Sequence, residues 1–476
     1  MAQDNKKESP ACCRPAKSPV APLVAFLFVT VAISLANASL YPLFDSVFPL
    51  ARDINVGTGL LASLAIVGVA LHCPRLLHPR ALGCGCIACA LAGSGLMTAG
   101  LGLNSPTLLC IGAVVRSTGT AWVSLLASAA CCSLSQRTLL VGIPVSYLAA
   151  SVLSWAIMHL DTAVALALLA LCPLLSYLFA RRDANALIED VRQAPAPSDA
   201  RLTQPASYLP LTNRMFVCIL LATVAMGFNL RVGPVEGGNA GSVVNVAVFA
   251  VLAILGRLVN STHGRLYDTT FRAGITLVIA AFLVLPLKSY LPLAQDLLGA
   301  ASACLNVVFS IVLVAAASRN RLSAPIVLAW GSLMPTLGSI AGANLGAFVA
   351  TGIAGDTAFL TSGAVACALV AYVLIGLEGF SFADTIAGIE PAQPLQVPKV
   401  SDAKRFDAAC ARLSQAFGLT PREAEVFALL ARGRNNAFVQ EELTLTRNTV
   451  KTYIKRIYAK LNIHSQQELI DLVEKG

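Results

Sequence analysis

Charge is scarce in this chain. Only 12% of its 476 residues are Asp, Glu, Lys or Arg, whereas 56% are hydrophobic. A soluble domain carries about 25% charged residues. A chain this poor in charge could not cover a water-exposed surface, which excludes a wholly soluble protein. Most of it must therefore face lipid, and we expect an all-α, polytopic membrane helix bundle.

Chemistry-bearing motifs are also missing. No Ser-His-Asp arrangement, phosphate-binding loop or His/Cys set with zinc spacing stands out, and the chain has only five histidines. Its fourteen cysteines lie mostly in apolar runs, as Cys84, Cys131 and Cys172 do, where cysteine packs as a small apolar residue. We therefore expect no enzyme activity, no cofactor and no metal site.

Long apolar runs are what the chain does have. A helix needs about 20 apolar residues to cross the hydrocarbon core. The sequence predicts twelve such spans in two sets of six, over 20–180 and 213–377, joined by a polar central segment at 181–212. The spans are expected near 21–40, 55–72, 81–103, 106–130, 138–158, 161–180, 213–230, 240–260, 272–292, 294–317, 323–350 and 356–377.

The loop charges predict the orientation. With the polar segment 1–19 in the cytoplasm, sixteen Lys and Arg residues fall on the inner side and three on the outer side, and cytoplasmic loops carry the basic excess. An even number of spans returns the C-terminus to the cytoplasm. We expect a bacterial inner-membrane protein with both termini cytoplasmic. The inner cations are Lys6, Lys7, Arg14, Lys17, Arg75, Arg80, Arg137, Arg181, Arg182, Arg192, Arg201, Arg214, Arg265, Arg272, Arg319 and Arg321; the outer ones are Arg52, Arg231 and Lys288.

Six spans, a long basic inner loop and six more spans resemble the major facilitator superfamily in topology, across about residues 20–377. The family's glycine/aspartate/arginine loop between spans two and three is absent, because residues 72–80 read HisCysProArgLeuLeuHisProArg. A degenerate version follows span eight, as Gly256-Arg257-Leu258 and then His263-Gly264-Arg265. The resemblance implies the architecture rather than transport.

No Asp or Glu falls in the middle of any predicted span, and Arg116 falls near the middle of span four. Ionisable residues at that depth are costly and are functional candidates. One hypothesis is that Arg116, with Asn37 and Asn229, contacts an anionic or carbonyl-bearing small molecule; the alternative is a structural arginine bonded to backbone carbonyls. The missing carboxylates argue against a proton-driven pump.

Span eleven carries Gly338, Gly342 and Gly346 at four-residue spacing, which lets helix backbones approach closely. Tight packing within the bundle is one interpretation; a rocking contact between the halves or a dimer face is the other.

The last segment is different in kind. Residues 378–410 are expected to form a linker and residues 411–476 a soluble helical domain. Thr420-Pro421-Arg422-Glu423 is a capping box with proline at the first helical position. Further helices are expected over 436–443, 447–461 and 465–473. From Leu445 to His464 there are five cations and no acid.

This segment resembles the LuxR/GerE-type helix-turn-helix of bacterial transcription regulators over residues 418–473. The matching residues are LeuThrProArgGluAlaGluVal at 419–426, LeuAlaArgGly at 430–433 and AsnThrValLysThrTyrIleLysArgIleTyrAlaLysLeu at 448–461. Two positions depart from the family pattern, Gln440 in the second helix and Tyr453 where the family commonly has His. A basic bundle that binds protein or lipid is the alternative.

The resemblance implies binding to double-stranded DNA with two half-sites, and a homodimer formed through the fourth helix. It implies that Lys451, Thr452 and Lys455 face base edges, while Arg447, Thr449 and Arg456 lie along phosphates. With no receiver domain expected before the tail, the signal should come from the membrane half. We therefore expect a membrane-bound transcription regulator that senses an unidentified small molecule; the alternatives are a transporter with a regulatory tail and a regulator with a membrane anchor.

Overall fold

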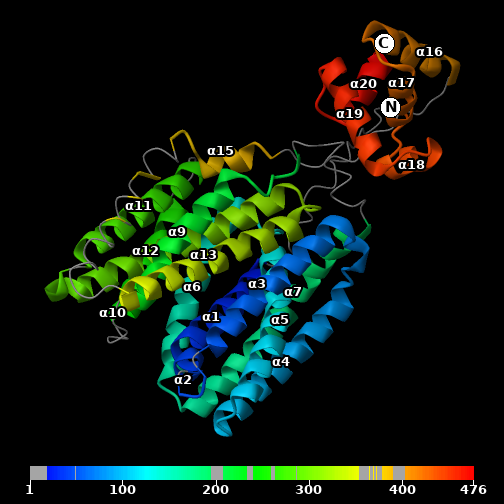
Figure 1. Ribbon diagram of the computed structural model, residues 1–476. Coiled ribbons are helices and arrows are strands. Elements are labelled where there is room, and N and C mark those ends of the chain that lie inside the picture. Colours follow the sequence, from blue (N-terminus) through cyan, green and yellow to red (C-terminus); the bar gives the residue numbers. More distant parts are fainter. Residues whose placement is uncertain are drawn as a thin grey trace, which may run out of the picture.

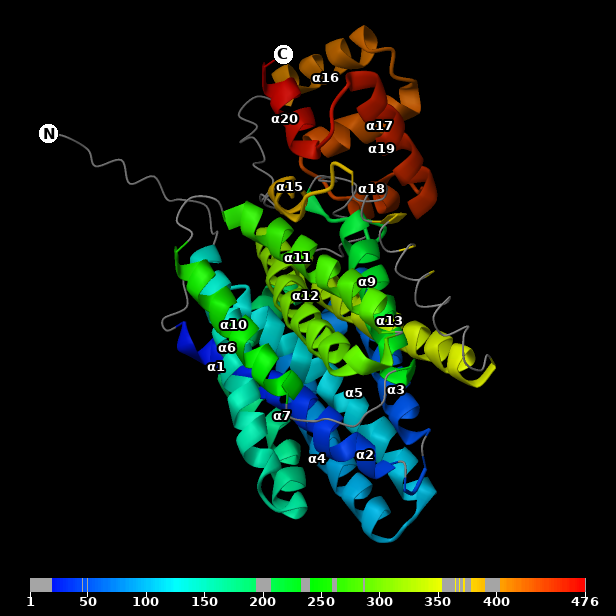
Figure 2. The ribbon, with the colours of Figure 1, turned by 90° about the vertical axis from the view of Figure 1, so that its left-hand side faces the viewer.

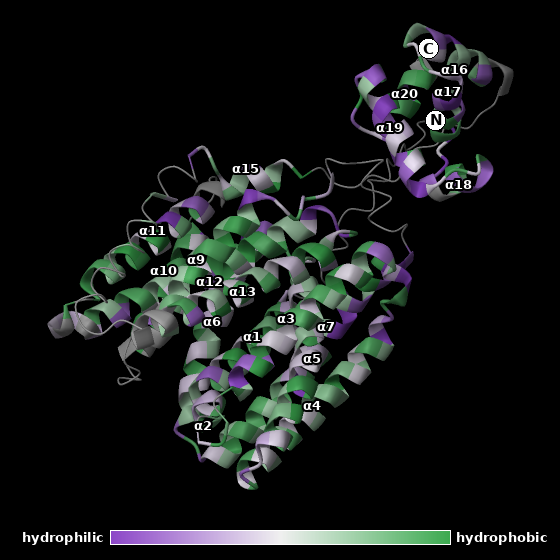
Figure 3. Cartoon of the chain, in the orientation of Figure 1, coloured by the Kyte–Doolittle hydropathy of each residue, from purple (hydrophilic) through white to green (hydrophobic). Residues whose placement is uncertain are grey.

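The computed structural model describes residues 19–44, 46–48, 50–193, 207–232, 240–258, 263–285, 287–352, 364, 368, 371–372, 378–389 and 403–475. Those residues form helices and connecting turns, without a strand among them (Figure 1). They divide into a large apolar bundle and a small C-terminal body, each with its own hydrophobic core. Figure 3 shows hydrophobic residues along the bundle helices and hydrophilic ones gathered at helix ends and on the C-terminal body.

The first half of the bundle contains six spanning elements. The first is a composite of α1 (Val20–Leu35), a π-helical turn η1 (Ala36–Leu40) and α2 (Tyr41–Phe44). The others are α3 (Ala51–His72), α4 (Pro79–Gly102), α5 (Pro106–Cys131), α6 (Gln136–Met158) and α7 (Thr162–Gln193), with the 3-10 turn η2 (Pro74–Leu76) before α4.

The second half contains α9 (Arg214–Val232), α10 (Ala240–Leu258), α11 (His263–Val284), α12 (Leu291–Arg319) and α13 (Ala324–Gly352), with the 3-10 turn η4 (Lys288–Tyr290) before α12. These helices correspond to predicted spans seven to eleven. Span twelve, at 356–377, lies outside the described residues apart from a few positions. Among these, Tyr372 donates its hydroxyl hydrogen to the Cys218 sulfur of α9 at 2.9 Å.

Nine of the described helices are long and apolar enough to cross a membrane, and Arg214–Phe228 and Val243–Leu258 are shorter apolar helices. Many large apolar side chains on these helices are exposed, including Leu61, Trp155 and Ile254. Such exposure suits a lipid environment, since water-facing surfaces rarely carry this much apolar area. The chain is therefore a multi-pass membrane protein.

The two halves pack against each other mainly through two helix pairs, α3 with α13 and α6 with α10 (Figures 1 and 2). These are the second and eleventh, and the fifth and eighth, of the predicted spans. In the α6–α10 pair, a Cβ added at Gly256 would lie 2.5 Å from the Leu140 carbonyl oxygen. Gly256, the first residue of the degenerate loop motif after span eight, therefore lets α10 pack closely on α6 of the other half.

The glycines of span eleven pack within the second half. A Cβ added at Gly342 would lie 2.7 Å from the backbone nitrogen of Phe228 on α9, and Gly338 and Gly346 face the same helix. The tight-packing interpretation therefore agrees with the geometry. The alternatives of a rocking contact between the halves and of a dimer face do not fit, because α9 and α13 belong to one half.

Several predicted boundaries differ from the structure, among them the three described below. The first span continues to Phe44 through η1, and α11 begins at His263, nine residues before the predicted start at 272. The start of α11 is helical because Tyr267 and Phe271 are buried on the second half. Likewise α7 continues to Gln193, well into the predicted central loop, because Leu187, Ile188 and Val191 bury an apolar stripe there.

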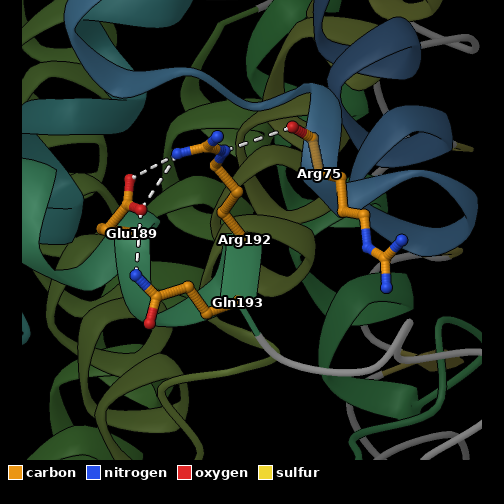
Figure 4. A network of polar contacts seen from close by, with 4 residues as sticks. All are labelled: Arg75, Glu189, Arg192 and Gln193. Carbon is orange, nitrogen blue, oxygen red and sulfur yellow. Dashed lines mark hydrogen bonds and ion pairs between the residues drawn. The ribbon is translucent and has the colours of Figure 1, made fainter.

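The extension of α7 is also fixed by polar contacts to η2 (Figure 4). Arg192 donates from Nη1 to the Glu189 carboxylate at 3.0 Å and from Nε to the Arg75 carbonyl oxygen at 3.3 Å. Gln193 donates to the same carboxylate at 3.0 Å. The end of α7 is thereby held beside the loop between α3 and α4.

The C-terminal body contains α16 (Ala403–Ala416), α17 (Pro421–Ala431), α18 (Asn436–Glu442), α19 (Arg447–Leu461) and α20 (Gln466–Lys475). Helix α16 and the short helix α15 (Phe382–Ala387) both fall where a linker was predicted. The body begins at Ala403 rather than 411 because Phe406, Ala409 and Cys410 pack into its core.

Candidate functional site

The helix-turn-helix unit begins at the predicted capping box of α17. The Thr420 backbone nitrogen donates to the Glu423 carboxylate at 2.8 Å, and the Glu423 nitrogen donates to the Thr420 hydroxyl at 3.4 Å. Glu423 is only 2% exposed. A carboxylate buried to this degree needs a partner, because an unpaired buried charge is strongly destabilising.

Lys460 is that partner. Its Nζ lies 2.6 Å from the Glu423 carboxylate and donates to the Gly418 carbonyl oxygen at 2.8 Å. The hydrogen bond from Lys460, and then that from the Thr420 backbone, hold the pKa of Glu423 below its usual range. Lys460 was grouped in the sequence with the cations of the basic helix, but it fastens α19 to α17.

The turn between α18 and α19 is tight. Thr444 adopts a positive φ of 53°, and the Leu445 nitrogen donates to the Gln440 carbonyl oxygen at 3.0 Å. Thr446 then caps α19, with its hydroxyl accepting from the Thr449 nitrogen at 3.3 Å. These local bonds fix the angle at which α19 leaves the turn.

Gln440, the larger residue at the family's usual small position, is accommodated without disrupting this turn. Its Nε2 donates back to the Asn436 carbonyl oxygen of its own helix at 3.0 Å. Helix α18 still packs on α19.

Helix α19 has two faces. Val450, Ile454, Ile457 and Leu461 lie in the core of the body. The opposite face is hollowed into a groove lined by Asn448, Thr449, Thr452, Tyr453 and Arg456. A polar, cationic groove on a helix that follows a tight turn suits contacts to a DNA backbone and to base edges.

The structure brings three of the six predicted DNA-binding residues, Thr449, Thr452 and Arg456, into this groove. Lys455 is exposed beside it, and Arg447 and Lys451 are partly exposed on the flank of the helix. Asn448 was not predicted as a contact residue. Its four-residue spacing to Thr452 and Arg456 is the signal that could have identified it, since residues at that spacing share a helix face.

The bundle interior holds the other predicted site. Arg116 is 4% exposed, and its Nε has no hydrogen-bond partner among the described residues. The Tyr41 hydroxyl and the Cys172 thiol act on it electrostatically. The described residues offer its guanidinium no bond to a backbone carbonyl, which removes the specific support for the structural alternative.

A small polar cluster adjoins Arg116 in sequence and space. The Ser117 hydroxyl donates to the Asn55 carbonyl oxygen at 2.6 Å, and Asn55 Nδ2 donates to the Tyr41 hydroxyl at 2.7 Å. Asn55 Oδ1 is buried without a partner. Arg52 lies 5.6 Å from the centre of the Tyr41 ring. Asn55 was not predicted as a site residue because the second span was expected to begin there.

The other two predicted ligand residues are not gathered there. Asn37 is exposed on η1 and donates to the Ile33 carbonyl oxygen of its own helix at 3.0 Å. The side chain of Asn229 lies outside the described part of the chain.

Comparison with known proteins finds relatives of the C-terminal body. Residues 418–473 match the family described as bacterial regulatory proteins, luxR family. Over 60 residues the chain is 38% identical to the transcriptional activator protein ExaE of Pseudomonas putida, which covers 12% of this chain and 28% of ExaE. The chain thus spans less than a third of that relative, and the likeness concerns the C-terminal body, which is a LuxR-type helix-turn-helix domain.

The bundle resembles solved transporters in fold. A bacterial homologue of the iron transporter ferroportin, in an outward-facing state with soaked iron, aligns with a TM-score of 0.51 and 12% identity over 78% of this chain and 99% of that one. The major facilitator superfamily transporter FucP aligns with a TM-score of 0.47 and 13% identity over 79% of this chain and 99% of that one. The bundle therefore shares the overall fold of the ferroportin homologue.

Proposed function

We propose that this chain, which joins a facilitator-like membrane bundle to a LuxR-type helix-turn-helix domain, is a membrane-bound transcription regulator. Its bundle senses a small molecule and controls how the C-terminal body engages double-stranded DNA. The observation that carries this proposal is the polar groove on α19, which Arg456 helps to line. Helix α19 is capped and packs into the hydrophobic core of the C-terminal body. Twelve spans are more than an anchor needs, which disfavours a passive membrane domain.

The basic loops support an orientation with both termini in the cytoplasm. The likeness of the C-terminal body to bacterial regulators supports a bacterial inner membrane. That arrangement puts the helix-turn-helix domain in the compartment that contains DNA. A homodimer formed through α20 would present two copies of α19 to two half-sites, which makes dimerisation a natural output.

We propose that the small molecule binds at Arg116. Its buried guanidinium nitrogen and the buried oxygen of Asn55 both lack partners among the described residues. A buried polar group without a partner costs free energy, so a ligand that satisfies both atoms would bind there favourably. Arg116 suits an anionic or carbonyl oxygen, and Asn55 Oδ1 suits a donor on the same ligand.

A second candidate is a carrier with a regulatory tail. The fold likeness to transporters favours it, whereas the lack of a carboxylate in mid-span disfavours coupling to protons.

Both candidates are tested on the full chain in proteoliposomes. Compounds are screened for changes in DNA binding by the external tail and, in parallel, for accumulation in the lumen. The regulator predicts compounds that shift the DNA dissociation constant without accumulating, and predicts that Arg116→Gln abolishes this shift. Accumulation with no effect on DNA would instead support the carrier. If Arg116→Gln folds and responds as the unmodified chain does, the ligand site is misplaced.

A further inference from the structure

The two halves of the bundle are joined by a hydrogen bond between an exposed glutamine and a buried tyrosine. Gln136, at the first position of α6, donates from Nε2 to the Tyr267 hydroxyl on α11 at 2.9 Å. Tyr267 is 2% exposed. A bond between residues 131 positions apart, one on each half, forms only while these ends of the halves are together.

Asp268, the residue after Tyr267, is hydrogen-bonded to the start of α15. Both oxygens of Asp268 accept hydrogen bonds from the start of α15, one from the Ser381 hydroxyl at 2.8 Å and one from the Phe382 nitrogen at 2.8 Å. Helix α15 lies between the last predicted span and the helix-turn-helix domain. Bonds to a carboxylate are stronger than neutral ones, so Asp268 is a firm attachment.

The apolar side of α15 packs on the second half of the bundle. Phe382 is 1% exposed, with its ring centre 5.0 Å from that of Phe271, and Ile386 and Ile389 are also buried. Figures 1 and 2 both show α15 lying across the end of the bundle, against α11 and α12, on the side of the C-terminal body. The segment 378–389 is therefore docked, although the sequence reads as a linker.

A second contact between the halves at this end is weaker. Arg321 lies 3.6 Å from Asp190 of α7, and the Asp190 side chain is 61% exposed. An exposed ion pair at that distance contributes little. The Gln136–Tyr267 bond is shorter, its tyrosine is buried, and Tyr267 adjoins Asp268, so it is the better candidate for a coupling between the halves and α15.

We propose that α15 is the element through which the bundle controls the DNA-binding body. Tyr267 and Asp268 couple the docking of α15 on the bundle to the contact between the two halves. When the halves part at this end, the Gln136–Tyr267 bond breaks, the first turn of α11 moves, and Asp268 no longer holds Ser381 and Phe382. Release of α15 lengthens and loosens the tether of the body. This route rests on the proposed regulatory function.

The test is hydrogen–deuterium exchange of residues 381–389 in the full chain in nanodiscs. Asp268→Ala removes both attachment bonds and should speed exchange there by about tenfold or more, since exchange reports local opening. Tyr267→Phe and Gln136→Ala leave both Asp268 bonds to α15 in place, yet each should speed the exchange of residues 381–389 about threefold to tenfold. Asp296→Ala and Tyr290→Phe make the same chemical changes elsewhere in the second half and should leave it unchanged.

Two results would overturn the proposal. Unchanged exchange in Asp268→Ala would show that α15 is not held there. Faster exchange in Asp268→Ala, with no change in Tyr267→Phe and Gln136→Ala, would show that the docking of α15 does not depend on the contact between the halves. Neither readout involves DNA, so failure of this route is distinguishable from failure of DNA binding.

Discussion

The basic residues of α19 divide by what their side chains contact. Lys460 is committed to Glu423 and the Gly418 carbonyl, whereas Arg456 lines the groove and Lys455 is exposed beside it. The resemblance to the LuxR/GerE family predicted Thr449, Thr452 and Arg456, which line the groove. The run of cations alone did not separate Lys460 from the others, because its partner Glu423 is 37 residues away and buried.

The Glu423–Lys460 pair predicts an acid-sensitive body. The folded pKa of Glu423 is lowered, first by the Lys460 hydrogen bond. The contribution of Glu423 to the free energy of unfolding is therefore complete above the pKa of an unfolded glutamate, about 4.3. It is lost as the pH falls through the lower pKa of the folded state. Glu423→Gln should lower the free energy of unfolding of residues 403–476 by about 1–3 kcal/mol at pH 7 and flatten its dependence between roughly pH 5 and 3. Urea unfolding followed by circular dichroism measures both.

Glu425→Gln is the matched control. Its carboxylate pairs with Arg422 on the surface, where both side chains are nearly half exposed, so the loss should be small. Equal losses in the two variants would contradict the structural role of Glu423.

Arg456 and Lys455 predict the salt dependence of DNA binding. Each phosphate contact adds about 0.9 to the slope of log affinity against log salt. Arg456→Ala should weaken binding to all sequences alike and reduce the slope by about one, measured by fluorescence anisotropy with residues 403–476. Arg412→Ala, on α16 and away from α19, should leave the slope unchanged; an effect equal to that of Arg456→Ala would place the DNA elsewhere.

At the scale of elements, small residues set how closely helices approach. The four-residue glycine spacing predicted close packing but not its partner, because any neighbouring helix could have filled that role. The structure places α9 there. Similarly, α15 escaped prediction because six residues are too few to show a helical period, and its burial depends on distant residues. Helix α16 does carry a helical period, in Phe406, Ala409, Cys410 and Leu413, and could have been predicted from it.

Gly342→Ala should therefore destabilise the second half. The added Cβ meets the α9 backbone at Phe228, which cannot yield as a flexible side chain would. Overpacking of this kind costs about 1–3 kcal/mol. The apparent melting temperature of the detergent-solubilised chain should fall, whereas Gly68→Ala, with nothing within 4 Å of the new Cβ, should not lower it comparably. Equal melting temperatures would contradict the assigned contact.

Helix α16 should be part of the folded DNA-binding body. A fragment of residues 411–476 lacks Phe406, Ala409 and Cys410, which pack on the core. It should unfold at a lower urea concentration than residues 403–476, because each buried apolar side chain contributes about 1–3 kcal/mol. Identical unfolding midpoints would return the domain boundary to 411.

At the scale of the whole molecule, composition, span count and the helix-turn-helix pattern predicted the class of protein, since each reflects many residues and survives local error. The docking of α15 was not predictable, because it depends on Asp268 and Phe271, more than a hundred residues earlier in the chain. Loop charges and the identity of the tail are independent observations, and both predict a cytoplasmic tail.

The most direct measurement is DNA binding by the full chain in nanodiscs, with double-stranded DNA from upstream of its own gene, at several salt concentrations. A membrane-bound regulator predicts binding whose logarithm falls linearly and steeply with the logarithm of salt, and which Lys455→Ala combined with Arg456→Ala largely removes. Absence of salt-dependent binding, or a double variant that binds as tightly as the unmodified chain, would contradict the account.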